Sequence, residues 1–130
     1  MKQLQRLFLC GGIGVVVFDA VASVASRAFD FPYTRASIGS FVIYAVVGFV
    51  AGRRFGLAMA AAAGVFLGLV DASLGWAVSR ALHANAPATP DVTPLLWVIV
   101  AITVSVTAAI CAVIGGVVAR ATRKREAPAG

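Results

Sequence analysis

Four long apolar runs constrain the fold of this chain more than any other feature of its sequence. They cover residues 7–29, 36–52, 55–82 and 94–119. A helix of about 20 mainly apolar residues crosses the hydrocarbon core of a bilayer. A chain of 130 residues that is 61% hydrophobic and only 12% charged cannot bury these runs in a water-soluble core. We therefore expect an all-α integral membrane protein in which residues 1–130 form one domain, a four-helix transmembrane bundle.

The connections between the runs are two short turns and an outer loop at residues 83–93, and a basic tail at residues 120–130 follows the last run. The outer loop contains several prolines, which suit an extended segment. The short turns make successive helices antiparallel neighbours. Thr93 and Pro94 suit the N-cap and the first residue of the last helix.

Basic residues are distributed unequally between the two ends of the expected bundle. Eight lie at the end that holds both termini: Lys2, Arg6, Arg53, Arg54, Arg120, Arg123, Lys124 and Arg125. Three lie at the opposite end: Arg27, Arg35 and Arg80. Because cytoplasmic segments carry the excess of Lys and Arg, we expect both termini in the cytoplasm and the chain in the inner (plasma) membrane. Tyr33, Trp76 and Trp97 are expected to form an aromatic belt at the outer interface.

The first run also has features of a cleavable signal peptide. Residues 1–6 are basic, and Ala20-Val21-Ala22 resembles a small-residue cleavage site. Asp19, directly before that site, and a second helix of the same kind later in the chain favour a retained helix. We expect the first helix to remain in the protein.

Two segments of the chain resemble each other closely enough to suggest an internal repeat. Residues 43–53 align without gaps on residues 110–120, with identity at six of the eleven positions. Gly12 and Gly64 each precede an aspartate by seven residues. We expect two parallel helical-hairpin repeats related by a pseudo-twofold axis along the membrane normal. The alternative is that shared apolar composition alone produces the match.

Two aspartates interrupt the apolar runs at matching places, Asp19 in the first run and Asp71 in the third. An acid at the bilayer centre costs about 2.5–3.5 kcal/mol on insertion scales, and such residues face the interior of a bundle. Helical spacing places both aspartates on faces of small or hydroxyl side chains. The expected ion or polar-solute site comprises Asp19, Asp71, Ser23, Ser37, Ser40, Tyr44, Thr103 and Thr107.

Glycines on the same faces are expected to allow close helix packing, because small residues let two backbones approach. These glycines are Gly12, Gly48, Gly64, Gly68, Gly75 and Gly115. We expect the first and third helices in particular to pack closely about the pseudo-twofold axis.

The aspartates leave three interpretations of function open. In the first, Asp19 and Asp71 bind a proton, a cation or a polar solute in a small transporter or channel. In the second, each aspartate is protonated and only hydrogen-bonds a neighbouring helix. In the third, the aspartates meet a basic residue of another subunit, and the chain is an accessory part of a larger membrane complex.

Other classes of function lack a motif in this sequence. His83 is the only histidine, and no nucleophile motif is present, so we expect no enzyme, no cofactor and no metal site. Cys10 and Cys111 lie inside apolar runs and fit no paired spacing, so we expect small core residues rather than metal ligands or a disulfide.

The expected partners are the lipid bilayer and either further copies of this chain or a larger membrane complex, and no nucleic acid. The positive charge gathers where apolar runs end, which is typical of membrane anchoring. The residues expected to contact lipid headgroups are Arg53, Arg54, Arg120, Arg123, Lys124 and Arg125.

Overall fold

The structure is a computed structural model that describes residues 2–84 and 93–126, with side chains as far as residue 123. Its elements are α1 (Lys2–Ala28), the 3-10 helix η1 (Tyr33–Ala36), α2 (Ser37–Phe55), α3 (Leu57–Val70), the π-helix η2 (Asp71–Gly75), α4 (Trp76–Ala81) and α5 (Pro94–Glu126). No strand occurs in these residues. Four helical stretches are long and apolar enough to cross a membrane: Lys2–Ala28, Tyr33–Phe55, Leu57–Ala81 and Pro94–Arg123. The all-α fold with four apolar helices is confirmed.

The helices extend further into the basic segments than the apolar runs do. α1 begins at Lys2, and α5 continues to Glu126, so the first part of the expected tail is helical. Arg and Lys are good helix formers, and cations near a helix C-terminus are favoured by its dipole. α2 likewise continues to Phe55, and the reversal into α3 is left to Gly56, whose φ of 94° suits a residue without Cβ. Most of the expected outer loop lies outside the described residues.

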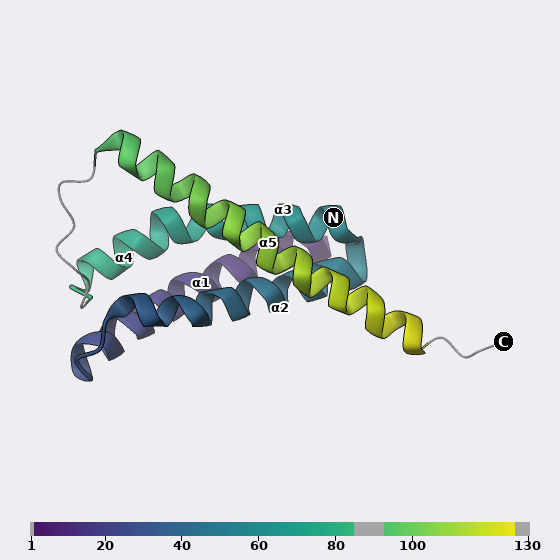
Figure 1. Cartoon of the computed structure of the whole chain (residues 1–130), viewed down its shortest axis with the longest axis horizontal. Coiled ribbons are helices and arrows are strands. Elements are labelled where there is room, and N and C mark those ends of the chain that lie inside the picture. The colour runs from purple at the N-terminus through teal and green to yellow at the C-terminus, as the bar shows by residue number, and fades with distance from the viewer. Residues whose placement is uncertain (1, 85–92, 127–130) are drawn as a thin grey trace.

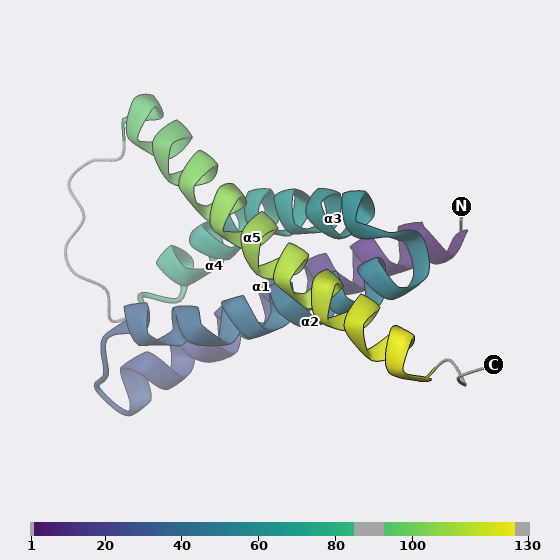
Figure 2. The same ribbon diagram turned by 45° about the vertical axis from the view of Figure 1, so that its right-hand side comes forward.

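The long helices run between two ends of the molecule (Figures 1 and 2). At the basic end α1 begins, α2 meets α3 and α5 ends. At the loop end α1 meets η1, α4 ends and α5 begins. α5 lies diagonally across α2 and α3, and α1 packs against α2, α3, η2 and α4. Within the described residues α5 approaches neither α1 nor α4, so its first turns diverge from the bundle at the loop end.

Glycines make the closest contacts between α5 and its two neighbours. A Cβ on Gly48 of α2 would lie 2.1 Å from the carbonyl oxygen of Ala112, and one on Gly115 would lie 2.0 Å from that of Ala45. A Cβ on Gly64 of α3 would lie 2.6 Å from the carbonyl oxygen of Ala108. These positions exclude any side chain, because backbone atoms occupy the space.

The first and third helices do pack against each other, through α3, η2 and α4, but two of the glycines expected at that contact face α5 instead. Gly64 and Gly68 of α3 face the backbone of α5, and α1 meets α3 through larger side chains. Phe8 and Phe66, for example, have ring centroids 5.1 Å apart. The physical reason is that α5 presents small residues to the glycines of α3, whereas aromatic rings hold α1 at side-chain distance from α3.

The core is small and consists mainly of alanine, and most large apolar side chains face outward. The buried cluster is Val15, Tyr44, Val47, Ala51, Ala60, Ala63, Leu67 and Ala108. Exposed side chains include Leu9, Val21, Ile38 and Ile114. Small residues inside and branched residues outside are the arrangement of helices that associate in lipid.

Candidate functional site: a carboxylate pair

The two aspartates meet in the interior, although 52 positions separate them in the sequence. A Cβ on Gly75 would lie 2.1 Å from Asp19 Oδ2 and 2.7 Å from Asp71 Oδ1. Both carboxyl groups therefore occupy the space that the missing side chain of Gly75 leaves. The Asp19 side chain is buried, and the Asp71 side chain is half-buried. The structure thus brings the aspartates of α1 and of the third apolar stretch together, while their use as an ion or solute site stays a prediction.

Tyrosines hold the outer oxygens of the pair. The Tyr33 hydroxyl donates a hydrogen bond to Asp19 Oδ1 at 2.9 Å, and the Tyr44 hydroxyl donates one to Asp71 Oδ2. Ser79 Oγ lies 2.8 Å from the Tyr33 hydroxyl and 2.9 Å from the Gly75 carbonyl oxygen. Each carboxyl group thus has one fixed donor on its outer side and the other carboxyl group on its inner side.

The inner oxygen of Asp19 has no hydrogen-bond donor among the described residues. Its nearest polar neighbour across Gly75 is the carboxyl group of Asp71. Two ionised carboxylates cannot hydrogen-bond each other, whereas one proton shared between them gives the inner oxygens a donor and an acceptor. A pair that carries one proton therefore satisfies the hydrogen-bonding requirement of both inner oxygens.

A π-helical turn positions Asp71 within the third apolar stretch. The turn spans Asp71–Gly75, and the Trp76 amide donates to the Asp71 carbonyl, five residues earlier. Asp71, Gly75 and Ser79 follow one another at four-residue spacing along this side of the helix. π-turns are rare within α-helices and occur frequently at functional sites.

The other hydroxyl residues predicted for the site take different positions. Ser23 is buried one turn after Asp19, and its hydroxyl donates to the Asp19 backbone carbonyl at 2.6 Å. Ser40 is buried one turn before Tyr44, whereas Ser37 is exposed. Thr103 and Thr107 donate to carbonyls of α5 itself, at 2.8 and 2.9 Å. Of the eight predicted residues, the structure brings three together: Asp19 and Asp71 form the pair, and Tyr44 hydrogen-bonds Asp71.

Two residues of the site were not predicted as part of it, Tyr33 and Ser79. Tyr33 was expected in an aromatic belt, but η1 turns it inward and its hydroxyl reaches Asp19. No periodic pattern marks this position, because the direction of a side chain in a 3-10 turn depends on tertiary packing. Ser79 does have a sequence signal, since it follows Asp71 by eight residues on a helix and so shares its face.

The arginines nearest the loop end have partners of their own. Arg27 donates to the carbonyl oxygen of Leu82 at 3.2 Å, and Arg80 lies 4.8 Å from the ring centroid of Trp76. Their charges are held at the loop end, away from the carboxylate pair. Among the described residues, no salt bridge joins a basic side chain to the pair.

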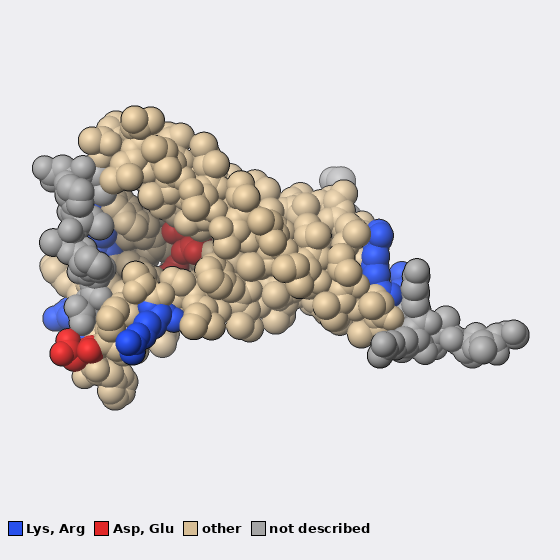
Figure 3. All heavy atoms as spheres, in the orientation of Figure 1, with Lys and Arg blue, Asp and Glu red and all other residues tan. Residues whose placement is uncertain are grey.

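A depression in the surface near the loop end has acidic atoms at its bottom. Figure 3 shows carboxylate atoms at the bottom of a depression in the surface near the beginning of α5. The first turns of α5 border this region and are exposed on all sides, including Leu95, Leu96, Val98 and Ile99. The divergence of α5 from α4 is what leaves the acidic atoms visible from outside.

The fold and the site together define a class of protein: a bundle of four apolar helices, long enough to cross a membrane, with a pair of carboxyl groups in its interior. Within the described residues, no group of three or more His, Cys, Asp and Glu side chains could hold a metal ion. Comparison of the chain with protein families, with curated proteins and with solved structures gave no match.

Proposed function

We propose that this chain is a small multi-pass membrane transporter or channel that moves protons or small cations by way of Asp19 and Asp71. The observation that carries the proposal is the meeting of the two carboxyl groups over Gly75. A hydrogen bond that only joins helices needs one acid and one neutral partner. Two acids facing each other instead make a place where positive charge is bound.

Electrostatics gives the pair a strong preference for a proton or a cation. Two unit charges about 4 Å apart repel by roughly 4 kcal/mol at an effective dielectric constant of 20. A proton shared by Asp19 and Asp71 replaces this repulsion with a hydrogen bond. A cation that enters the pair would release this proton, so binding of the two would be competitive.

The hydroxyl groups extend the pair into a chain of hydrogen bonds. From the loop end the chain runs from Ser79 to Tyr33 to Asp19, and Asp71 continues it to Tyr44. Towards the basic end it stops at the buried core. We propose that the pair is reached from the loop end, while the buried core closes the path towards the basic end, as in one half of an alternating-access cycle.

We further propose that the basic end faces the cytoplasm, in the inner (plasma) membrane. Eight basic residues at one end against three at the other support this orientation. The proposal of two parallel hairpin repeats has support in the site itself, because twofold-related copies would bring equivalent aspartates together near their axis. The π-turn at Asp71 has no counterpart at Asp19, where α1 is a regular α-helix.

A structural or accessory role is the second candidate, and two hydrogen bonds favour it. Tyr44 joins α2 to Asp71, and Tyr33 joins η1 to Asp19. Such bonds hold helices together in a membrane, at about 0.6 kcal/mol each on average. In this role the aspartates would stabilise the bundle, alone or in a larger complex, without binding a solute.

The experiment that separates the two roles measures flux and stability together. The Asn variants, Asp19→Asn and Asp71→Asn, keep a hydrogen-bonding side chain but remove the carboxyl group that can ionise. The Leu variants, Asp19→Leu and Asp71→Leu, remove both the hydrogen bond and the ionisable group. For a proton or cation site, we expect the Asn variants to be stable in detergent but without pH-dependent flux in proteoliposomes. Asn variants with the flux and stability of the parent would refute the ion site and leave the structural role.

A further inference from the structure

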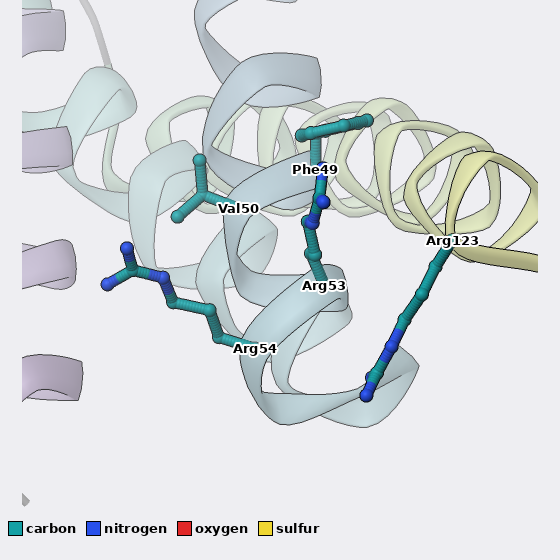
Figure 4. Close-up of a pocket in the computed structure, with 5 residues that line it drawn as sticks. All are labelled: Phe49, Val50, Arg53, Arg54 and Arg123. Atoms are coloured by element: carbon teal, nitrogen blue, oxygen red, sulfur yellow. The ribbon is translucent and has the colours of Figure 1, made fainter. Parts of the chain in front are cut away.

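A pocket of about 660 Å³ lies at the basic end, remote from the carboxylate pair, between the last turns of α2 and α5 (Figure 4). Its lining combines two apolar residues with three arginines: Phe49, Val50, Arg53, Arg54 and Arg123. The apolar residues are half-buried and the arginines are exposed. The pocket thus has an apolar wall and a cationic rim.

The crossing of α2 and α5 produces this pocket. The two helices touch at Gly52, where an added Cβ would lie 2.4 Å from the Cα of Gly116. Beyond this contact α2 turns back at Gly56, while α5 continues to Glu126 and past the end of α2. The space that opens between the diverging helices is the space that Arg54 and Arg123 border.

The chemistry of the lining matches one kind of ligand. A guanidinium presents a planar fork of N–H donors that fits the oxygens of a phosphate. Phe49 and Val50 beside the arginines offer a surface for the first carbons of an acyl chain. Basic pockets between transmembrane helices on the cytoplasmic side are known binding places for anionic lipid headgroups.

From this geometry we infer that the pocket is a specific site for the phosphate headgroup of an anionic phospholipid. The phosphate lies between the guanidinium groups of α2 and α5, and the glycerol and acyl carbons lie against Phe49 and Val50. The bound headgroup joins the ends of two helices that otherwise diverge. This site is independent of the carboxylate pair, so it stands even if the proposed transport is wrong.

In the described conformation Arg54 and Arg123 point away from each other, so binding a shared phosphate requires both side chains to rotate. In Figure 4 the side chains of Arg54 and Arg123 extend from different helices on opposite sides of the end of α2. Mutual repulsion keeps like charges apart, and the rotatable bonds of each arginine allow both to turn towards a shared anion.

The test measures thermal stabilisation of the purified full chain in detergent by added lipid. Phosphatidylglycerol is compared with phosphatidylcholine and with inorganic phosphate. The pocket variant is Arg54→Gln with Arg123→Gln. The matched control is Arg6→Gln with Arg35→Gln, which removes the same charge from exposed positions outside the pocket.

We expect phosphatidylglycerol to stabilise the parent more than phosphatidylcholine does, with no effect of inorganic phosphate. Each pocket arginine contributes about fivefold to the affinity, so the pocket variant needs roughly 25-fold more phosphatidylglycerol for half its effect. The control variant should shift less than twofold, and both variants should unfold at the parent temperature without lipid. Equal loss in the two variants would mean diffuse surface charge, and stabilisation by inorganic phosphate would mean a soluble anion; either result overturns the inference.

Discussion

Replacing Gly75 by alanine is the sharpest perturbation of the carboxylate pair that leaves both acids in the chain. The added methyl group would lie 2.1 Å from Asp19 Oδ2, whereas ordinary contact begins at 3.4 Å. The carboxyl group of Asp19 must therefore move by about 1.3 Å, and Asp71 Oδ1 must move as well. The methyl group then separates the two acids and prevents them from sharing a proton.

The expected change in stability is modest, because side chains and not backbone obstruct the methyl group. Overpacking a well-filled interior costs typically about 1–3 kcal/mol, and the better helix propensity of alanine offsets up to about 1 kcal/mol of this. We expect Gly75→Ala to lose roughly 0–2 kcal/mol of unfolding free energy, measured by denaturant titration in mixed micelles, and to lose most flux in proteoliposomes.

Two other glycines provide matched controls for this substitution. A Cβ on Gly14 of α1 meets nothing within 4 Å, so Gly14→Ala should keep both stability and flux. A Cβ on Gly48 meets the backbone of Ala112 at 2.1 Å, so Gly48→Ala should cost about 3 kcal/mol or more by forcing α2 and α5 apart. If Gly75→Ala behaves like Gly14→Ala in both assays, the carboxyl groups do not meet over Gly75 and the proposed site is wrong.

Three further predictions concern topology, the tyrosine donors and helix packing. In a chain without its native cysteines, a membrane-impermeant thiol reagent applied to intact cells should label Ala84→Cys and not Gln3→Cys; the reverse pattern would invert the proposed orientation. Tyr44→Phe removes a hydrogen-bond donor to Asp71 and should lower the unfolding free energy by roughly 0.6–1.7 kcal/mol in mixed micelles, and unchanged stability would argue against this hydrogen bond. Gly64→Leu should abolish folding as judged by size-exclusion chromatography, whereas Val65→Leu on the exposed side should be tolerated, and equal tolerance would place the glycine face in lipid.

The sequence was sufficient for the helices and for the acidic half of the site, for a simple physical reason. Burying a charge in an apolar run is costly, so Asp19 and Asp71 had to face inward. The four-residue spacing of Asp71, Gly75 and Ser79 also follows from helix geometry alone. The expected repeat stays a prediction.

The parts that could not be predicted depend on contacts between elements. The inward turn of Tyr33 depends on where η1 docks, and no local pattern determines this. The π-turn at Asp71 changes the hydrogen-bond pattern without a distinctive residue type. The glycines of α3 were recognised as a packing face, but a face of small residues does not specify its partner, and α5 rather than α1 occupies it.

Because α5 crosses α2 and α3 diagonally, it can rotate as a rigid helix about this crossing point. The close contacts of α5 extend from Ser105, against Gly68, to Gly116, against Gly52, and Ile110 lies near the middle of this stretch. At 1.5 Å per residue Pro94 lies about 24 Å from Ile110 along α5. A rotation of about 10° would move Ser105 by only about 1 Å and Pro94 by about 4 Å. The width of the entrance above the aspartates would then be governed by small adjustments at distant glycine contacts.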